Sequence, residues 1–210
     1  IWLTPSLDWL LLTKRPENFH ARIFQAWHDA QPNAMTYYGL KDWDRGTPPT
    51  NVWIGTTVED QQRADERIPA LIKIPARVRF LSCEPLLGPV YLSGTVPIPW
   101  GGGESQGGRD YSPQLDFIHW VICGGESGPN ARPMHPDWAR RLRDQCARAN
   151  VPFFFKQWGE WLPVCEDPQN WKSVPNGFDW HRGKESTVLQ LDGRQATEHP
   201  GTQMTMIRTG

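Results

Sequence analysis

The sequence has few cysteines, and none of them are clustered. The four are Cys83, Cys123, Cys146 and Cys165, and no two form a CxxC pair. Zinc and redox motifs need cysteines close together in the sequence, so this spacing argues against such a motif. Cys83 and Cys123 lie within or beside apolar runs, where a free thiol packs as a small hydrophobic group. We therefore expect buried, reduced cysteines and no disulfide framework.

Long apolar runs and a strong excess of one charge are also missing. No run reaches the roughly 18 apolar residues of a membrane-spanning helix, so we expect no membrane association. The formal net charge is −1, which provides no overall attraction to nucleic acid, so any such site must be a local patch. The first residues include no Met and no basic signal region. We expect a cytoplasmic location and a chain cut from a longer protein.

Five short apolar runs predict buried strands, because most of them are continuous rather than alternating. They cover residues 9–12, 52–54, 78–81, 117–122 and 152–155. Apolar residues at helical spacing predict helices over residues 16–29, 59–72 and 136–150. The alternation of strand and helix indicates an α/β fold with a parallel sheet.

The predicted architecture is a partial parallel β/α barrel of TIM type over residues 1–161, with about five strands. Five strands leave a barrel open, so we expect further strands before residue 1. The Gly- and Pro-rich stretch at about 91–116 predicts a long, mobile surface insertion. Residues 162–210 form an irregular C-terminal extension, in which Asp192 and Gly193 predict the turn of a short β hairpin.

Polar clusters follow each predicted strand. Because the carboxyl ends of parallel strands meet on one face, these clusters predict a single mouth. Its charged residues are Lys14, Arg15, Glu59, Glu84, Glu126, Arg132 and Lys156.

The carboxylates at this mouth differ in how easily a structural role explains them. Glu59 is explained as a carboxylate at a helix N-terminus. Glu84 precedes a proline and Glu126 lies in the Gly-rich segment 124–128, so they rank highest as catalytic residues. The backbone of segment 124–128 predicts a nest for an anion or an amino-acid-like group, whose ammonium Glu126 would bind. The same tetrapeptide, Gly-Gly-Glu-Ser, also occurs at residues 102–105. No predicted strand precedes that copy, so we predict no binding site there.

Other features keep two interpretations open. Lys14 and Arg15 either clamp an anion or form an ordinary charge pair at a helix start, and their unfavourable position near a helix N-terminus slightly favours the first.

Most of the twelve tryptophans fit core packing, which we also prefer over base stacking for Trp158 and Trp161. The helix arginines 140, 141 and 143 fit a solvated surface better than a nucleic-acid site. The histidines show no metal-ligand spacing, and only His135 lies near the mouth.

The strand-end motifs resemble a known family. In order they are 12–16 (LTKRP), 53–59 (WIGTTVE), 80–89 (FLSCEPLLGP), 120–128 (WVICGGESG), 131–133 (ARP) and 154–159 (FFKQWG). The sequence from about Leu10 to Trp161 resembles the phage-associated three-Cys-motif proteins, which are similar to radical S-adenosylmethionine enzymes.

This resemblance implies a β/α barrel that binds S-adenosylmethionine and, through clustered cysteines after its first strand, a [4Fe–4S] cluster. The present chain lacks those cysteines, so both cofactors are expected only of the full-length protein, and no metal ligand is predicted here. We predict that Glu84 and Glu126 are catalytic. The predicted cofactor-binding residues are Lys14, Thr56, Gly124 and Gly125, and the predicted substrate-binding residues are Arg15, Arg132, Lys156, Gln157 and Trp158.

Three functional hypotheses follow. The first is part of a phage-type radical S-adenosylmethionine-like protein that acts on nucleic acid or on a phage-encoded partner protein, with this chain alone inactive. The second is a non-enzymatic module that holds nucleic acid or protein through its tryptophans and the arginine helix. The third is a metal-independent hydrolase or lyase, which needs two carboxylates close together.

Overall fold

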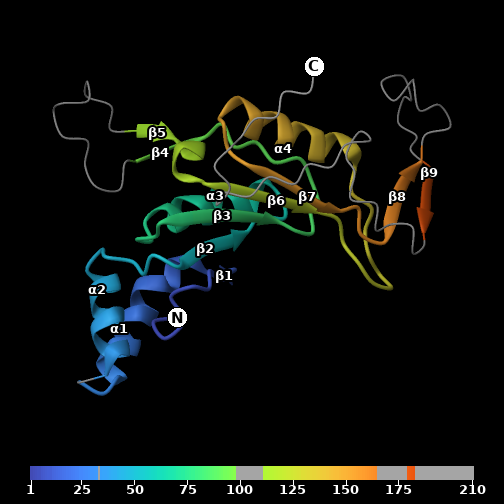
Figure 1. Cartoon of the computed structure of the whole chain (residues 1–210). Coiled ribbons are helices and arrows are strands. Elements are labelled where there is room, and N and C mark those ends of the chain that lie inside the picture. The colour runs from blue at the N-terminus through green and yellow to red at the C-terminus, as the bar shows by residue number, and fades with distance from the viewer. Residues whose placement is uncertain (33, 98–110, 165–178, 183–210) are drawn as a thin grey trace.

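The computed structural model describes residues 1–32, 34–97, 111–164 and 179–182 (Figure 1). Its centre is a five-stranded sheet in which every neighbouring pair is parallel. The strands are β1 (Trp9–Thr13), β2 (Val52–Thr57), β3 (Val78–Cys83), β6 (Trp120–Gly124) and β7 (Phe153–Gln157). All five predicted strands are therefore confirmed, with small shifts at their ends.

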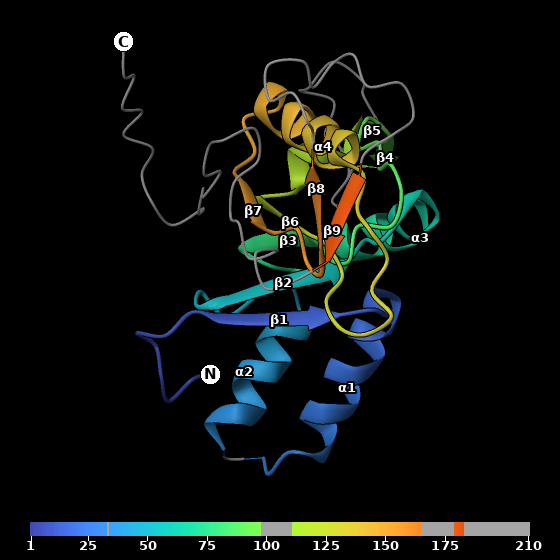
Figure 2. The same ribbon diagram turned by 90° about the vertical axis from the view of Figure 1, so that its right-hand side faces the viewer.

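The order of the strands in the sheet is their order in the chain, β1-β2-β3-β6-β7. Each new strand lies next to the previous one on the same side, whereas the strand order of a doubly wound sheet reverses its direction near the middle of the sheet. This winding is consistent with a partial α/β barrel. Figure 2 shows β1 at one end of the sheet and β7 toward the other.

Two of the predicted helices, those following β2 and β6, are present with clear start signals. Helix α3 (Gln61–Ile72) begins after Asp60, whose carboxylate accepts a hydrogen bond from the Arg63 amide at 2.9 Å. The interpretation of Glu59 as the capping carboxylate is thus wrong, since Asp60 has that role. Helix α4 (Pro136–Arg148) begins after His135, whose ring Nδ1 accepts from the Asp137 amide.

The segment between β1 and β2 is more helical than predicted. A 3₁₀ turn, η1 (Pro16–Asn18), leads into α1 (Phe19–Asp29), and a further helix, α2 (Met35–Asp44), packs against α1. Helix α2 buries only Trp43, so its sequence lacks the apolar stripe that predicts a helix. These two helices project away from the sheet at the lower left of Figure 1.

The described part of the region after β3 includes two short strands, a 3₁₀ turn and a buried residue. Strands β4 (Thr95–Pro97) and β5 (Tyr111–Pro113) pair antiparallel, and residues 98–110 lie outside the described part. A short 3₁₀ turn, η3 (Gln114–Phe117), follows, and its last residue is the first residue of the stretch predicted as the fourth strand. Leu92, inside the predicted insertion, is buried.

Two glutamines fix the chain just before β4. Gln145 on α4 accepts from the Leu92 amide and donates to the Val90 carbonyl. Gln61 on α3 makes the same two kinds of bond with the backbone of Tyr91. Each glutamine thus satisfies backbone groups as a neighbouring strand would, which ties the segment to both helices.

The C-terminal part contains one described hairpin. Strand β8 (Trp161–Val164) pairs antiparallel with β9 (Asp179–Arg182). The hairpin predicted around Asp192 and Gly193 lies outside the described residues. No helix in the described ranges is long and apolar enough to cross a membrane.

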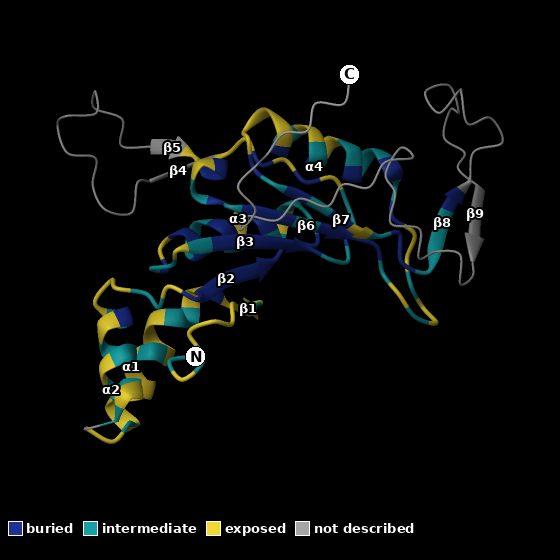
Figure 3. Ribbon diagram, in the orientation of Figure 1, coloured by how far each residue is buried: buried dark blue, intermediate teal, exposed yellow. Residues whose placement is uncertain are grey.

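Both faces of the central strands β2, β3 and β6 are packed, as their dark colour in Figure 3 shows, whereas the residues of β1 are largely exposed. The main core lies between the sheet and the helices and includes Leu81, Cys83, Cys123 and Cys146. These three cysteines are free and buried, which confirms their prediction as packing residues. On the opposite face Trp53, Phe80 and Trp120 form a second cluster, in which Trp53 and Trp120 meet edge to face.

Candidate ligand site at the carboxyl ends of the strands

The polar residues at the ends of β3, β6 and β7 meet at one pocket, whereas those after β1 and β2 form a separate cluster. The pocket has a volume of about 370 Å³, and its wall is formed by the end of β3 and the residues after it, the residues after β6, the last two residues of β7 and one residue of β1. The lining residues are Leu12, Ser82, Glu84, Pro85, Gly125, Glu126, Ser127, Lys156 and Gln157. The pocket therefore brings both predicted catalytic carboxylates and three of the other predicted site residues, Gly125, Lys156 and Gln157, onto one wall.

Glu84 and Lys156 form an ion pair at this wall, with 3.1 Å between Lys156 Nζ and Glu84 Oε1. The Ser82 hydroxyl donates to the other carboxylate oxygen of Glu84 at 3.2 Å. The side chain of Glu84 is 18% exposed and that of Lys156 is 52% exposed. The pair is thus held at the protein surface, with its cationic end open to a ligand.

This ion pair crosses a strand, because β6 lies between β3 and β7 in the sheet. Gly124 of β6 makes the crossing possible: a Cβ there would lie 2.7 Å from Glu84 Oε1. The β6–β7 register also shifts, from Cys123 opposite Phe155 to Gly124 opposite Gln157, so Lys156 is skipped. Irregularities of this kind redirect a side chain at the end of a sheet.

Glu126 is held by Arg132. The Arg132 guanidinium donates to both carboxylate oxygens at 2.8 and 2.9 Å, and the Arg132 amide also donates at 2.9 Å. These hydrogen bonds lower the pKa of Glu126 to about 2. Glu126 is therefore a fixed anion at neutral pH, which suits it to bind a cation and not to donate a proton.

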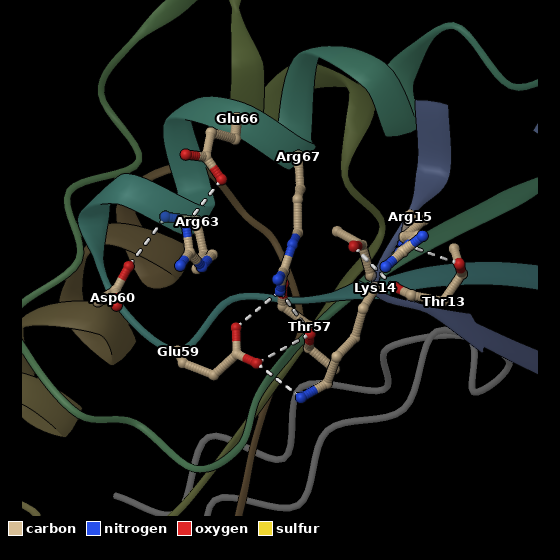
Figure 4. Close-up of polar contacts among 10 residues, drawn as sticks. Thr13, Lys14, Arg15, Thr57, Glu59, Asp60, Arg63, Glu66 and Arg67 are labelled. Carbon is tan, nitrogen blue, oxygen red and sulfur yellow. Dashed lines mark hydrogen bonds and ion pairs between the residues drawn. The ribbon is translucent and has the colours of Figure 1, made fainter. Parts of the chain in front are cut away.

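A second polar cluster lies at the ends of β1 and β2 (Figure 4). Glu59 accepts from Lys14 Nζ at 3.1 Å and from Arg67 of α3 at 2.7 Å, and Arg67 also donates to the Thr57 hydroxyl. Burial acts to raise the pKa of Glu59, but the hydrogen bond from Lys14 and the charge of Arg67 leave it lowered. Sequence reasoning missed Arg67, because its partner is fixed only when α3 folds back along β2.

The glycines have packing roles in addition to any contact with a ligand. A side chain at Gly125 would overlap the backbone of Trp158, and one at Gly159 would overlap the backbone of Glu126. Gly159 also has a φ of +86°. The two segments are joined by hydrogen bonds from Gly125 N to Gln157 O and from Glu160 N to Glu126 O. Close backbone contact therefore explains Gly125 without a cofactor.

Two predicted binding residues are buried away from the pocket. The Thr56 hydroxyl donates to the Thr13 carbonyl at 2.9 Å and so ties β2 to β1. Trp158 is 3% exposed and packs edge to face on Phe155, as the core interpretation predicted. Arg15 is exposed beside Lys14. Gln157 lines the pocket and donates to the Ser127 hydroxyl at 3.0 Å.

The arginines of α4 are engaged within the protein. Arg140 pairs with Asp137, Arg143 pairs with Asp144, and Arg141 donates to the Tyr91 hydroxyl. Acidic neighbours on the same helix reduce the positive potential that nucleic acid needs. This arrangement agrees with a solvated helix surface.

An iron–sulfur cluster does not fit the residues that the structure describes. No group of three or more His, Cys, Asp or Glu among them could hold a metal. Burial raises the pKa of the Cys83 and Cys123 thiols well above the usual range, which opposes the thiolate form that iron requires. No chemistry of these residues is therefore assigned to such a cluster.

Comparisons with known proteins give one match. No curated protein and no solved structure matches the chain. A family model described as "Protein of unknown function (DUF5131)" matches residues 1–200, nearly the whole chain. Because this model covers nearly all of the chain, the chain that carries the strand-end pocket belongs to the DUF5131 family.

Proposed function

We propose that this chain is the ligand-binding part of a phage-type, radical S-adenosylmethionine-like barrel, with a small-molecule site at the carboxyl ends of its strands. The observation that carries the proposal is the Glu84–Lys156 ion pair on the wall of the pocket. Opposite charges held a few ångströms apart match a ligand that carries both an ammonium and a carboxylate group. The pocket volume of about 370 Å³ also falls within the range of small-molecule sites.

S-Adenosylmethionine carries these two groups on its methionine part. Lys156 is positioned to donate to the ligand carboxylate, and Glu84 to accept from the ligand ammonium. Glu126, ionised and oriented by Arg132, adds a second negative charge at the same pocket. In this proposal Glu84 and Glu126 bind and orient the ligand. No proton transfer is assigned to Glu126, since its pKa of about 2 leaves it ionised.

The substrate proposed for the complete protein is nucleic acid or a phage-encoded partner protein. The exposed cations around the mouth support this substrate class. Arg15 is exposed, Lys14 and Arg132 have side chains 65% and 61% exposed, and all three follow strands that end near the pocket. Such cations bind phosphate or carboxylate groups of a larger substrate.

Isothermal titration calorimetry with S-adenosylmethionine tests the proposal. We expect binding to the wild-type chain and a loss of about tenfold or more in affinity for Glu84→Gln and for Lys156→Met. A hydrogen bond to a charged group contributes about 1.5–3 kcal/mol, which corresponds to that loss. Methylthioadenosine, which lacks the amino-acid part, should bind the wild type and both variants with the same, weaker affinity.

Matched controls are Glu66→Gln on α3 and Lys73→Met directly after it, which remove the same groups at residues that do not line the pocket. They should leave the affinity for S-adenosylmethionine unchanged. Equal affinity of the wild type for S-adenosylmethionine and methylthioadenosine would contradict the assignment of Glu84 and Lys156.

The alternative, a non-enzymatic nucleic-acid or protein module, draws less support from the contacts. Its two proposed binding elements are engaged elsewhere: Arg140 and Arg143 pair with acids of α4, and Trp158 is buried. The hydrolase or lyase hypothesis also lacks a favourable observation, because Glu59, Glu84 and Glu126 each pair with a cation.

A further inference from the structure

The charges on the wall of the strand-end pocket do not balance. Of the lining residues in the described part of the chain, three are charged: Glu84, Glu126 and Lys156. Two carboxylates and one ammonium group give the wall a formal charge of −1. Glu84 and Lys156 form an ion pair and compensate each other, so the excess negative charge lies on Glu126. A ligand that complements this wall carries one more positive charge than negative charge.

Arg132 compensates Glu126 only from outside the pocket. It is not a lining residue, and its side chain is 61% exposed, whereas that of Glu126 is 26% exposed. Solvent and salt screen an exposed charge more strongly than a partly buried one. The pair therefore turns its negative end toward the pocket, and the two-pronged contact with the guanidinium fixes the direction of the carboxylate.

The two carboxylates of the wall differ in the hydrogen bonds that they can still accept. Glu126 Oε2 accepts from the amide and from Nε of Arg132, and Glu126 Oε1 accepts from Nη2 of Arg132. Glu84 accepts one contact at each oxygen, from Lys156 and from the Ser82 hydroxyl. Since each carboxylate oxygen accepts about two hydrogen bonds, Glu84 keeps more of its acceptor capacity than Glu126 does. Glu84 thus suits a cation that donates hydrogen bonds, and Glu126 suits a cation that donates none.

We propose that Glu126 is a specificity-determining residue that recognises a sulfonium cation. This inference rests on the proposed function, in which the ammonium of S-adenosylmethionine lies at Glu84 and its carboxylate at Lys156. The sulfonium sulfur has a permanent positive charge and no hydrogen to donate, so it interacts with Glu126 through charge alone. It also supplies the excess positive charge that the wall requires. S-Adenosylhomocysteine has the same ammonium and carboxylate but a neutral thioether, so the pocket discriminates against it.

Isothermal titration calorimetry with these two ligands tests the role of Glu126. We expect the wild-type chain to bind S-adenosylmethionine about tenfold more tightly than S-adenosylhomocysteine, as a charge a few ångströms away at a partly exposed site provides. Glu126→Gln should reduce the affinity for S-adenosylmethionine by about the same factor and leave that for S-adenosylhomocysteine unchanged. Glutamine has nearly the shape of glutamate, so contacts with the sulfonium methyl group are retained in this variant.

Glu84→Gln is the comparison variant. Both ligands carry the ammonium group, so this change should weaken both by the same factor and preserve their ratio. Equal affinity of the wild-type chain for the two ligands, while Glu84→Gln weakens both, would overturn the role of Glu126 and leave the proposed function intact. An unchanged ratio in Glu126→Gln would have the same meaning. If the wild-type chain binds neither ligand, this inference and the proposed function are both wrong.

Discussion

Gly124 is the residue on which the geometry of the candidate site depends most directly. Its missing side chain leaves the space through which Glu84 reaches Lys156 across β6. The sequence marks Gly124 only as part of a Gly-rich segment. Its actual role is steric: the absence of a side chain in the sheet leaves room for the Glu84 carboxylate, which then pairs with Lys156 at the pocket.

Gly124→Ala should therefore lower the affinity for the ligand clearly while changing the stability of the fold only slightly. The added methyl group displaces the Glu84 carboxylate, which breaks the ion pair with Lys156. We expect a loss of about tenfold in affinity for S-adenosylmethionine, as for Glu84→Gln, with the melting temperature shifted by only a few degrees.

Gly55→Ala is the comparison for this experiment. A side chain at Gly55 would overlap the ring of Phe80, which belongs to the buried aromatic cluster. Overpacking a core costs about 1–3 kcal/mol, so this variant should melt clearly lower. If Gly124→Ala melts as low as Gly55→Ala, the steric role assigned to Gly124 is wrong.

The Glu126–Arg132 pair gives a prediction for pH at the residue scale. The pKa of Glu126 is lowered from 4.5 to about 2, so the carboxylate stays ionised well below pH 4. Because the folded pKa is the lower one, its stabilising contribution is complete above about pH 4.5 and is lost as the pH falls toward 2. Carboxyl NMR titration measures this pKa directly.

Arg132→Met is the control variant for that titration. Without the guanidinium the pKa of Glu126 should move back toward 4.5. A Glu126 carboxyl that titrates near 4.5 in the wild type would show that the pair is not formed in solution.

At the scale of elements, the segment between β3 and β4 is positioned by the two helices that it crosses. The Gln145 side chain on α4 bonds to the backbone of Val90 and Leu92, and Leu92 is buried. These bonds satisfy backbone groups that the burial of the segment removes from water. The helix thereby decides the path of a chain segment that carries no regular structure of its own.

Gln145→Leu should destabilise the fold through this contact. The variant leaves the Leu92 amide and the Val90 carbonyl without their partner, at a cost of about 1–3 kcal/mol. Urea unfolding followed by circular dichroism measures the change. Gln62→Leu serves as control, since the Gln62 amide bonds only to Glu66 on the exposed face of α3 among the contacts described, and it should change the free energy of unfolding by less than about 0.5 kcal/mol.

At the scale of the whole molecule, stability should fall in mildly acidic solution because of His119. Burial and the charge of Arg79 lower the pKa of His119 from 6.5. Its Nδ1 accepts a hydrogen bond from the Arg79 amide, which requires the ring nitrogen without its proton. In the unfolded chain His119 binds a proton more readily than in the folded one. The contribution of neutral His119 to the free energy of unfolding is therefore complete above pH 6.5 and is lost as the pH falls below it.

The expected result is a lower urea midpoint at pH 5.5 than at pH 7.5. His119→Asn keeps an acceptor but does not titrate, so it should reduce the difference between the two pH values. His28→Asn, on the exposed face of α1, should leave the difference unchanged. An unaltered pH dependence in His119→Asn would assign the effect to other groups.

The sequence by itself determined the five strands, their parallel arrangement and the polar residues at the carboxyl ends of the strands. These features depend on local patterns: continuous apolar runs, the helical spacing between them, and polar residues after each strand. The packing role of the buried cysteines also followed from their apolar neighbours. Such signals are contained within a few residues, so they can be read without knowledge of the fold.

Only the tertiary structure decided which charged residues meet. Glu84 pairs with Lys156 and Glu59 with Arg67 because the strand order, the register shift in β7 and the absence of a side chain at Gly124 bring them together. Helix α2 was likewise not predicted from the sequence, since it buries one residue instead of an apolar stripe along one helix face. Contacts between distant parts of a chain depend on the packing of whole elements, and no local pattern encodes them.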